Sequence, residues 1–454
     1  MKIYKKNEHS VLVTPFGVGG KLYLSVTTMI FFDLTAPESP LKEQELWGVI
    51  PGELPKGHVL DQGLPKPKRE VLVTGACCAP RGEIWPGAEI SFRVGNLRKR
   101  LMVFGDRYWR MTGYAVNAVT PATAFSQMPI SYENAFGGPG FEFNPLGKGL
   151  QPTKFLGVDP LIPLPNIENP QHLMAMPEDR PQPAGFGPLD MMWPQRARKN
   201  GTYDDKWLRE RWPFFPDDMN YEFFNTAPED QQAEGFFRGD ENLKILHMHP
   251  DYQDLTSRLP GLRIRCFVTQ KTDLKPTANA EEIFKEVTTR IDTVWLFPGI
   301  LRGVVMYRGS TKILDDEYSD VTHLFVASEN LAEPPKPIEF YHQDQLKATD
   351  LKVPIDLSPL ADAPGKTNKA LHKLRLIPQQ LNDAKKRAMG QAPRLGITPE
   401  EAMAAGPKII QDQLSMLTAL ETKLQALKVR LSPFSHLVKV DYGFIADIRT
   451  KLLA

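Results

Sequence analysis

The sequence predicts an α+β protein: a predominantly antiparallel β body, sandwich-like or barrel-like with long irregular loops, and a C-terminal α-helical region. Runs of β-branched and aromatic residues recur up to residue 330, bounded by glycine and proline. After residue 366, apolar residues instead recur at helical spacing. Because 454 residues exceed one core of ordinary size, we expect a β-rich domain at 1–330, an acidic, proline-rich connector at 331–365 and a basic helical region at 366–454.

The strands of the β body can be assigned in chain order. Alternation over residues 11–34 predicts a hairpin that turns at Gly19–Gly20, followed by a proline-rich excursion. Periodicity then fades from residue 129 to 254, apart from a helix predicted at Asp204–Trp212, and a stretch of this length is usually functional. A short helix is expected at Asp320–Ser328. The other predicted strands are Glu70–Cys78, Glu89–Val94, Leu97–Phe104, Thr112–Ala118, Leu262–Gln270, 287–298 and 302–309.

The C-terminal region carries its own pattern. Thr398-Pro399-Glu400-Glu401 is a capping box, and a longer helix is expected from Lys408 to Leu431. Its leucine stripe needs a partner, which is either the 374–388 stripe of the same chain or a second protein. The chain stops at KLLA without a closing signal, which leaves a truncation or a longer natural form as alternatives. The stripe that we expect to make a contact consists of Leu417, Leu420, Leu424 and Leu427.

Composition and charge exclude several classes of protein. Lys+Arg 55 against Asp+Glu 54 give a net charge of +1, so no global field attracts nucleic acid or membrane. Three cysteines suit a reducing compartment. The N-terminus lacks the apolar core of a secretory signal, and the longest apolar run, Met29–Phe32, is far below the roughly 20 residues of a membrane span. We therefore predict a cytoplasmic protein without nucleic-acid or membrane partners.

The most informative segment is a hairpin in the SFRVGNLRKRLMVF run. A two-residue turn at Gly95-Asn96 would place Val94 opposite Leu97 on a largely apolar core face, with Arg93 opposite Arg98 on the other face. The same register would place Arg100 opposite a serine. Like charges directly opposite each other cost stability. Three explanations stay open at this point: an acidic partner protein, the acidic 315–362 segment of the same chain, or arginines that splay apart in water.

No motif of a catalytic, cofactor or metal site is complete. His247 and His249 lack a third ligand nearby, and Cys77 lies at the end of an apolar strand where thiols are inert. The glycine-rich runs complete neither nucleotide-binding pattern. Glu133 could pair with another carboxylate as general acid and base, but nothing in the sequence places such a pair together. We therefore predict no catalytic residue, no cofactor and no metal.

Beyond the hairpin, the chain resembles a known family. The runs VLVTGACCAPRGE, MPISYENAFGG, PAGFGPLDMMWPQR, FFNTAPEDQQ and DTVWLFPGILRGVVMYRG keep the order found in the bacterial family of unknown function 2169. Members accompany type VI secretion systems. The resemblance implies a non-enzymatic adaptor or chaperone that binds an effector with a PAAR-like tip domain and helps to load it onto the trimeric spike. It supplies no catalytic residue.

The hairpin arginines and the family resemblance favour the same hypothesis, a protein that binds another protein. Loop aromatics near the hairpin either fill a core or anchor a partner, as arginines can. A β-rich hydrolase that uses Glu133, and a structural baseplate or spike component, are the competing interpretations. The residues that we expect to touch the effector or its tip domain are Arg93, Arg98, Arg100, Phe104, Arg107, Trp109, Tyr132, Phe136 and Phe141.

Overall fold

The longest strands meet in a seven-stranded sheet with the order β16-β5-β21-β22-β3-β2, and β4 pairs with β3 at one end. All neighbours are antiparallel except β5 and β21. β3 (Lys21–Asp33) is buried over most of its length because it lies between β2 and β22. The other strands are β2 (Ser10–Val18), β4 (Ala36–Pro40), β5 (Arg69–Val73), β16 (Gln232–Ala233), β21 (Arg290–Phe297) and β22 (Arg302–Lys312).

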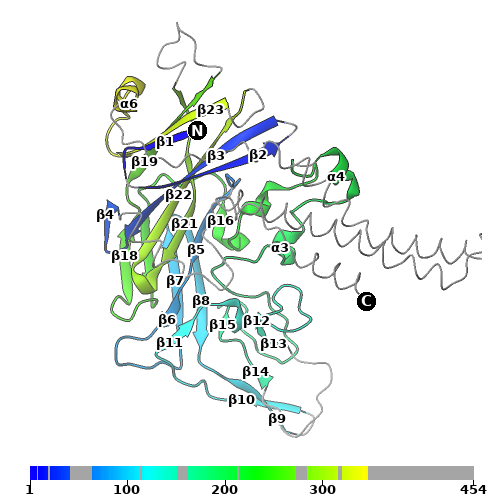
Figure 1. Cartoon of the computed structure of the whole chain (residues 1–454). Helices are drawn as coiled ribbons and strands as arrows, with labels where there is room; N and C mark the ends of the chain where they lie inside the picture. Colours follow the sequence, from blue (N-terminus) through cyan, green and yellow to red (C-terminus); the bar gives the residue numbers. More distant parts are fainter. Residues whose placement is uncertain are drawn as a thin grey trace, which may run out of the picture. The chain divides into compact units, whose positions relative to one another are not determined.

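A five-stranded antiparallel sheet, β15-β8-β7-β17-β18, carries the predicted hairpin (Figure 1). Its inner face is apolar, with Ile90, Val94 and Leu101 almost inaccessible to solvent, as the alternation predicted. Phe92 of this face meets Phe186 of the irregular centre edge-on, with ring centroids 5.1 Å apart. The strands are β7 (Gly87–Val94), β8 (Leu97–Phe104), β15 (Ile167–Glu168), β17 (Asn242–Leu246) and β18 (Asp254–Arg258).

The remaining sheets are smaller. A four-stranded sheet has the order β1-β23-β19-β20, a three-stranded sheet the order β10-β9-β14, and β11–β6 and β12–β13 are pairs. In Figure 1, α6 lies at the top of the drawn helices and strands, and β9 and β10 lie at the bottom. The strands are β1 (Lys2–Lys5), β6 (Ala76–Cys78), β9 (Tyr108–Thr112), β10 (Ala115–Val119), β11 (Gln127–Pro129), β12 (Phe136–Gly137), β13 (Lys148–Gly149), β14 (Ile162–Pro163), β19 (Leu262–Gln270), β20 (Lys285–Glu286) and β23 (Val321–Asn330).

Helices are few and short in the part of the chain that the computed structural model describes. Asp204 caps α4 by accepting a 2.7 Å hydrogen bond from the backbone N–H of Trp207, which confirms the predicted helix. The α-helices are α3 (Pro194–Ala197), α4 (Asp205–Glu210) and α6 (Ile338–Gln345). The 3₁₀ turns are η1 (Tyr132–Asn134), η2 (Tyr221–Phe224), η3 (Glu229–Gln231) and η5 (Pro298–Ile300).

The structure describes residues 1–7, 9–18, 21–40, 64–112, 115–150, 162–211, 214–271, 284–314 and 320–345. Except for Met1, they belong to one unit that spans Lys2–Val353. The strand-rich, mostly antiparallel body confirms the predicted fold class. The predicted C-terminal helices, the 417–427 leucine stripe and the Gly19–Gly20 turn lie outside the described residues.

One predicted element is wrong. Residues 320–328 do not form a helix, because β23 runs through them between β1 and β19. Both edges of β23 make sheet hydrogen bonds, and a run from Leu324 to Ala327 is buried. β-Branched and aromatic side chains suit this central position, and sheet pairing outweighed the local pattern. The short strands β17 and β18 were not predicted either, since the fading periodicity after residue 129 concealed them.

Candidate partner-binding face

The hairpin adopts the predicted register. Arg93 pairs with Arg98, and Val94 pairs with Leu97, in the β7–β8 ladder. Gly95 has a φ of 57° and Asn96 does not share this left-handed conformation, as in a type II′ turn with glycine at its first central position. The turn and the strand alternation together fix which side chains face outward.

The structure extends the cationic row of the hairpin onto a third strand. β17 pairs with β7, and this register sets Lys244 directly opposite Arg93. Arg98, Arg93 and Lys244 therefore form a row across β8, β7 and β17, on which neighbouring Cβ atoms lie about 5 Å apart. Two residues before Lys244, Asn242 of β17 lies on the same face and pairs with Arg258 of β18. We call the outward face of these four strands, with Arg93, Arg98, Arg100, Lys244 and Arg258, the cationic face.

Few carboxylates balance this face. Arg100 pairs with Glu89 at 3.3 Å and Lys244 pairs with Asp254 at 2.8 Å, so three positive charges are in excess. The five cationic side chains are exposed. Within the described residues no carboxylate lies within 4.0 Å of the Arg98 or Arg258 guanidinium, and Arg93 donates from Nε only to its own turn, at the Gly95 carbonyl oxygen 2.9 Å away.

The acidic segment of the same chain was one expected partner for these arginines. Its described acids do not pair with them: Glu329 binds Arg263 and Arg265 at 2.9 and 3.2 Å instead. The segment's remaining acids include residues 344–362, whose side chains lie outside the described part of the chain. For the described residues, two explanations of the facing arginines therefore remain: an acidic partner protein, or solvation of both side chains in water.

The inner face of the hairpin carries a cation with a structural role, Lys99. Lys99 stands opposite Phe92 on the inner face and is nearly buried. Its Nζ donates to Asp230 at 2.8 Å and to Gln231 at 3.0 Å, which ties η3 to the underside of the sheet. Burial lowers the pKa of Lys99, and the Asp230 charge acts in the opposite direction. This cation is matched by partners, whereas Arg98 has no carboxylate partner among the described residues.

Phe104 and Arg107 lie at the far end of the hairpin. Phe104 shares the outward face of β8 by alternation, and the Arg107 guanidinium stacks over its ring at 3.7 Å. Arg107 also pairs with the nearly buried Glu168. Burial lowers the pKa of Arg107 and raises that of Glu168, while each partner's charge opposes the shift. The two half-buried side chains are held in place by these contacts.

The other predicted aromatic contacts lie in the irregular centre. Trp109 and Phe136 are buried in a cluster with Ile162, and the half-buried Phe141 packs against it. Tyr132 meets Trp193 edge-on, with ring centroids 4.9 Å apart. The structure therefore brings Trp109, Phe136 and Phe141 together in a small core. In this structure their role is packing.

The residues considered for chemistry have ordinary structural surroundings. His247 makes a 2.7 Å hydrogen bond to the Glu89 carbonyl oxygen, and His249 accepts from the Asp251 backbone N–H at 3.1 Å. Across the described ranges no group of three or more His, Cys, Asp or Glu residues could hold a metal ion. Cys77 is buried, which raises the pKa of its thiol to about 12. Glu133 is exposed on η1.

Two cations of the face, Lys244 and Arg258, were missed by the sequence reasoning. A signal existed for β17, where polar and apolar residues alternate in NLKI, whereas DLTSR of β18 contains a single apolar residue. These strands are only five residues long and sit inside a stretch dominated by loops. The pairing of β17 with β7 depends on contacts between segments far apart in the chain.

Comparison with known proteins identifies the family. A family model described as an uncharacterized protein conserved in bacteria (DUF2169) matches residues 19–308, which is more than half of the chain. The chain belongs to this family. The matched region contains the hairpin, β17 and β18, and hence the whole cationic face. No curated protein and no solved structure matches the chain. Over the described residues, no helix has the length and apolarity to cross a membrane.

Proposed function

We propose that this DUF2169 protein is a non-enzymatic adaptor that uses the cationic face to bind a type VI secretion effector with a PAAR-like tip domain. It stabilises this cargo and promotes its loading onto the trimeric spike protein. Two observations support the proposal: the ordered sequence motifs that resemble such adaptors, and the three adjacent cations on β8, β7 and β17.

The main support for the proposal is the cationic row, because these facing like charges do not stabilise the fold. Facing like charges destabilise a sheet by up to about 1 kcal/mol per pair. Carboxylates of a bound cargo would remove this cost, since each would lie between two guanidinium or ammonium groups. Such complementarity speeds the encounter and selects the partner more than it raises affinity. A polar interface also suits a cargo that has to be released at the spike.

The test compares two charge-reversal variants of the full chain. The first variant replaces Arg93, Arg98 and Arg100 by Glu, and the matched control replaces Arg110, Arg180 and Arg209, which are exposed on other segments, in the same way. We expect the first variant to bind the PAAR-like effector of the same bacterium at least about tenfold more weakly, as three lost charge pairs require. The control should bind normally.

Effector binding is measured by pull-down and by the shift in size-exclusion chromatography when effector is added to the lone chain. Circular dichroism establishes that both variants are folded. Undiminished effector binding by the Arg93, Arg98 and Arg100 variant would refute the role of the cationic face. A lone chain that forms a closed ring or trimer would instead favour a structural spike component.

A further inference from the structure

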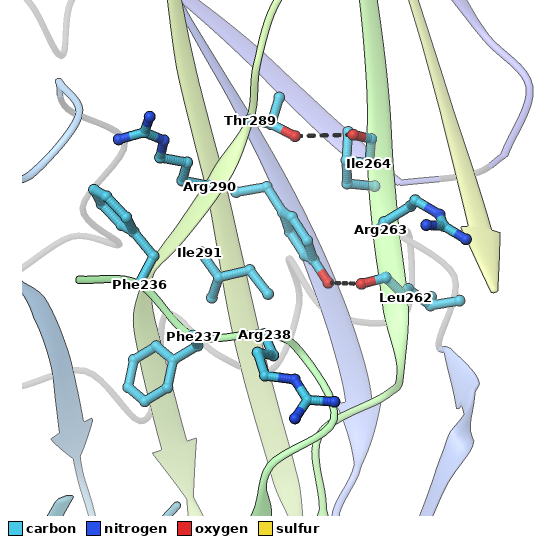
Figure 2. A pocket seen from close by; sticks show the side chains of 10 residues that line it. Phe236, Phe237, Arg238, Leu262, Arg263, Ile264, Thr289, Arg290 and Ile291 are labelled. Atoms are coloured by element: carbon cyan, nitrogen blue, oxygen red, sulfur yellow. Dashed lines mark hydrogen bonds between the residues drawn. The ribbon is translucent and has the colours of Figure 1, made fainter. Parts of the chain in front are cut away.

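A small pocket opens between the loop at Phe236–Arg238, the start of β19 and the start of β21 (Figure 2). Its volume is about 160 Å³. Phe237, Ile264 and Ile291 are buried there and give it an apolar lining. A cavity of about 150 Å³ can hold a benzene molecule, so a pocket of this volume has room for one large apolar side chain.

The polar groups at the pocket are already satisfied by the protein. The Tyr307 hydroxyl donates to the Leu262 carbonyl oxygen at 2.7 Å, and the Thr289 hydroxyl donates to that of Ile264 at 2.8 Å, as the dashed lines in Figure 2 show. Both hydroxyl hydrogens are therefore already used, and these two side chains have no free donor to offer a ligand. The apolar part of a ligand is the part that this lining favours.

Three arginines surround the apolar lining, one from each side: Arg238, Arg263 and Arg290. Arg263 is held by the nearly buried Glu329 at 2.9 Å. Arg238 pairs with Asp240 at 2.9 Å, but both side chains are exposed. Arg290 stacks over the Phe236 ring at 4.9 Å, and no described carboxylate pairs with it. Arg290 and Arg238 can thus exchange their contacts for those of a ligand.

We propose that this pocket binds an acidic peptide segment of the cargo, with one large apolar side chain in the pocket and a carboxylate on either side of it. Arg290 binds one carboxylate and Arg238 the other. The assignment rests on the proposed adaptor function, because it names the kind of cargo segment that is recognised. An exposed ion pair such as Arg238–Asp240 contributes little, so its exchange for a cargo carboxylate costs little.

The two arginines favour an internal segment over a chain terminus. They come from different elements, the loop before β17 and the first residue of β21. A terminal residue has a single main-chain carboxylate and could satisfy one of them. A segment with acids before and after the apolar residue satisfies both.

The pocket also adjoins the turn of the hairpin. Arg69 donates to the Asn96 side chain at 2.9 Å and stacks over Phe237 at 5.4 Å. A Cβ atom at Gly95 would lie 3.1 Å from Cγ of Glu241, whose carboxylate accepts from the backbone N–H of Arg238 at 2.6 Å. A cargo segment in the pocket is therefore close to the strand ends that carry Arg93 and Arg98.

The experiment uses the full chain and a fluorescein-labelled, amide-capped peptide, Gly-Asp-Asp-Phe-Asp-Asp-Gly, in fluorescence anisotropy. We expect Arg290→Ala and Arg238→Ala each to weaken binding by up to about fivefold, since each removes an ion pair at an exposed arginine. Arg209→Ala, at an exposed arginine of α4, is the matched control and should bind like the wild type. Replacing the peptide's Phe by Ser should weaken binding to a similar degree.

Each other outcome has a defined meaning. Binding that is insensitive to Arg290→Ala and Arg238→Ala overturns the assignment, and so does a peptide that ends in Phe with a free carboxylate and binds tenfold more tightly. Absence of peptide binding while the effector is still captured overturns the pocket assignment alone. Arginine-dependent peptide binding without effector capture by the wild type supports the pocket and overturns the adaptor proposal.

Discussion

The seven-stranded and five-stranded sheets both carry arginines, but in opposite surroundings. Arg308 of β22 has a side chain with 0 % exposure and pairs with the equally buried Asp292 of β21. Arg98 of β8 is exposed, faces Arg93 and has no described carboxylate partner. A buried charge is tolerated only when it is paired. The difference indicates that Arg308 serves the fold, whereas Arg98 is available for recognition.

A second buried charge explains how the irregular centre attaches to the large sheet. Glu70 of β5 is fully buried and pairs with Lys66. Its carboxylate also accepts from the Asn225 side chain and the Thr226 backbone N–H at 2.9 Å, and from the Ala227 backbone N–H at 3.2 Å. The NTAPEDQQ run therefore acts as a clamp that holds the loop region against β5, which is a structural use of the motif.

The largest effect is expected when one member of the buried Arg308–Asp292 pair is removed. We expect Arg308→Met to lower the free energy of unfolding by about 3 kcal/mol, because the buried Asp292 loses its ion-pair partner and keeps only the Lys66 charge and the hydrogen bonds from the Lys66 N–H and the Thr293 hydroxyl. Burial already raises the pKa of Asp292, and the Arg308 charge opposes this shift. Urea denaturation measures the loss. The double variant Arg308→Met with Asp292→Leu should regain most of it, and a loss below about 1 kcal/mol in the single variant would contradict a structural role.

The clamp at Glu70 should show a smaller, more local effect. Glu70→Gln keeps one acceptor oxygen but removes the charge opposite the buried Lys66 and weakens the contacts to Asn225, Thr226 and Ala227. We expect a loss of about 2 kcal/mol in unfolding free energy. Hydrogen exchange should be faster at the Thr226 and Ala227 amides in particular. Unchanged protection of these two amides would show that the clamp does not hold the loop.

The smallest effect is expected on the cationic face. Arg98→Ser removes a charge directly opposite Arg93 without exposing or burying any new group. Stability should change by no more than about 1 kcal/mol, in the direction of greater stability, because like-charge repulsion is relieved. Thermal unfolding at low salt measures this difference. A clear destabilisation would mean that Arg98 supports the fold and would remove the distinction between the two sheets.

Local patterns predicted much of the β body. The β7–β8 register followed from period-two alternation and a glycine at the turn, both of which act between residues close in sequence. β19 was predicted with its observed bounds for the same reason. The helix predicted at residues 320–328 was wrong because the strand that they form depends on β1 and β19, which come from distant parts of the chain.

The amino-acid pattern was enough to show that Arg93 and Arg98 face each other outward, since a strand and a tight turn are short-range structures. It did not show that Lys244 completes their row, that Glu329 engages Arg263 and Arg265 instead, or that Trp109 and Phe136 share a core. Those placements depend on which distant segments pack together. Burial and long-range pairing are set by the whole fold, so only the tertiary structure separates the cations that hold the protein together from those that remain available to a partner.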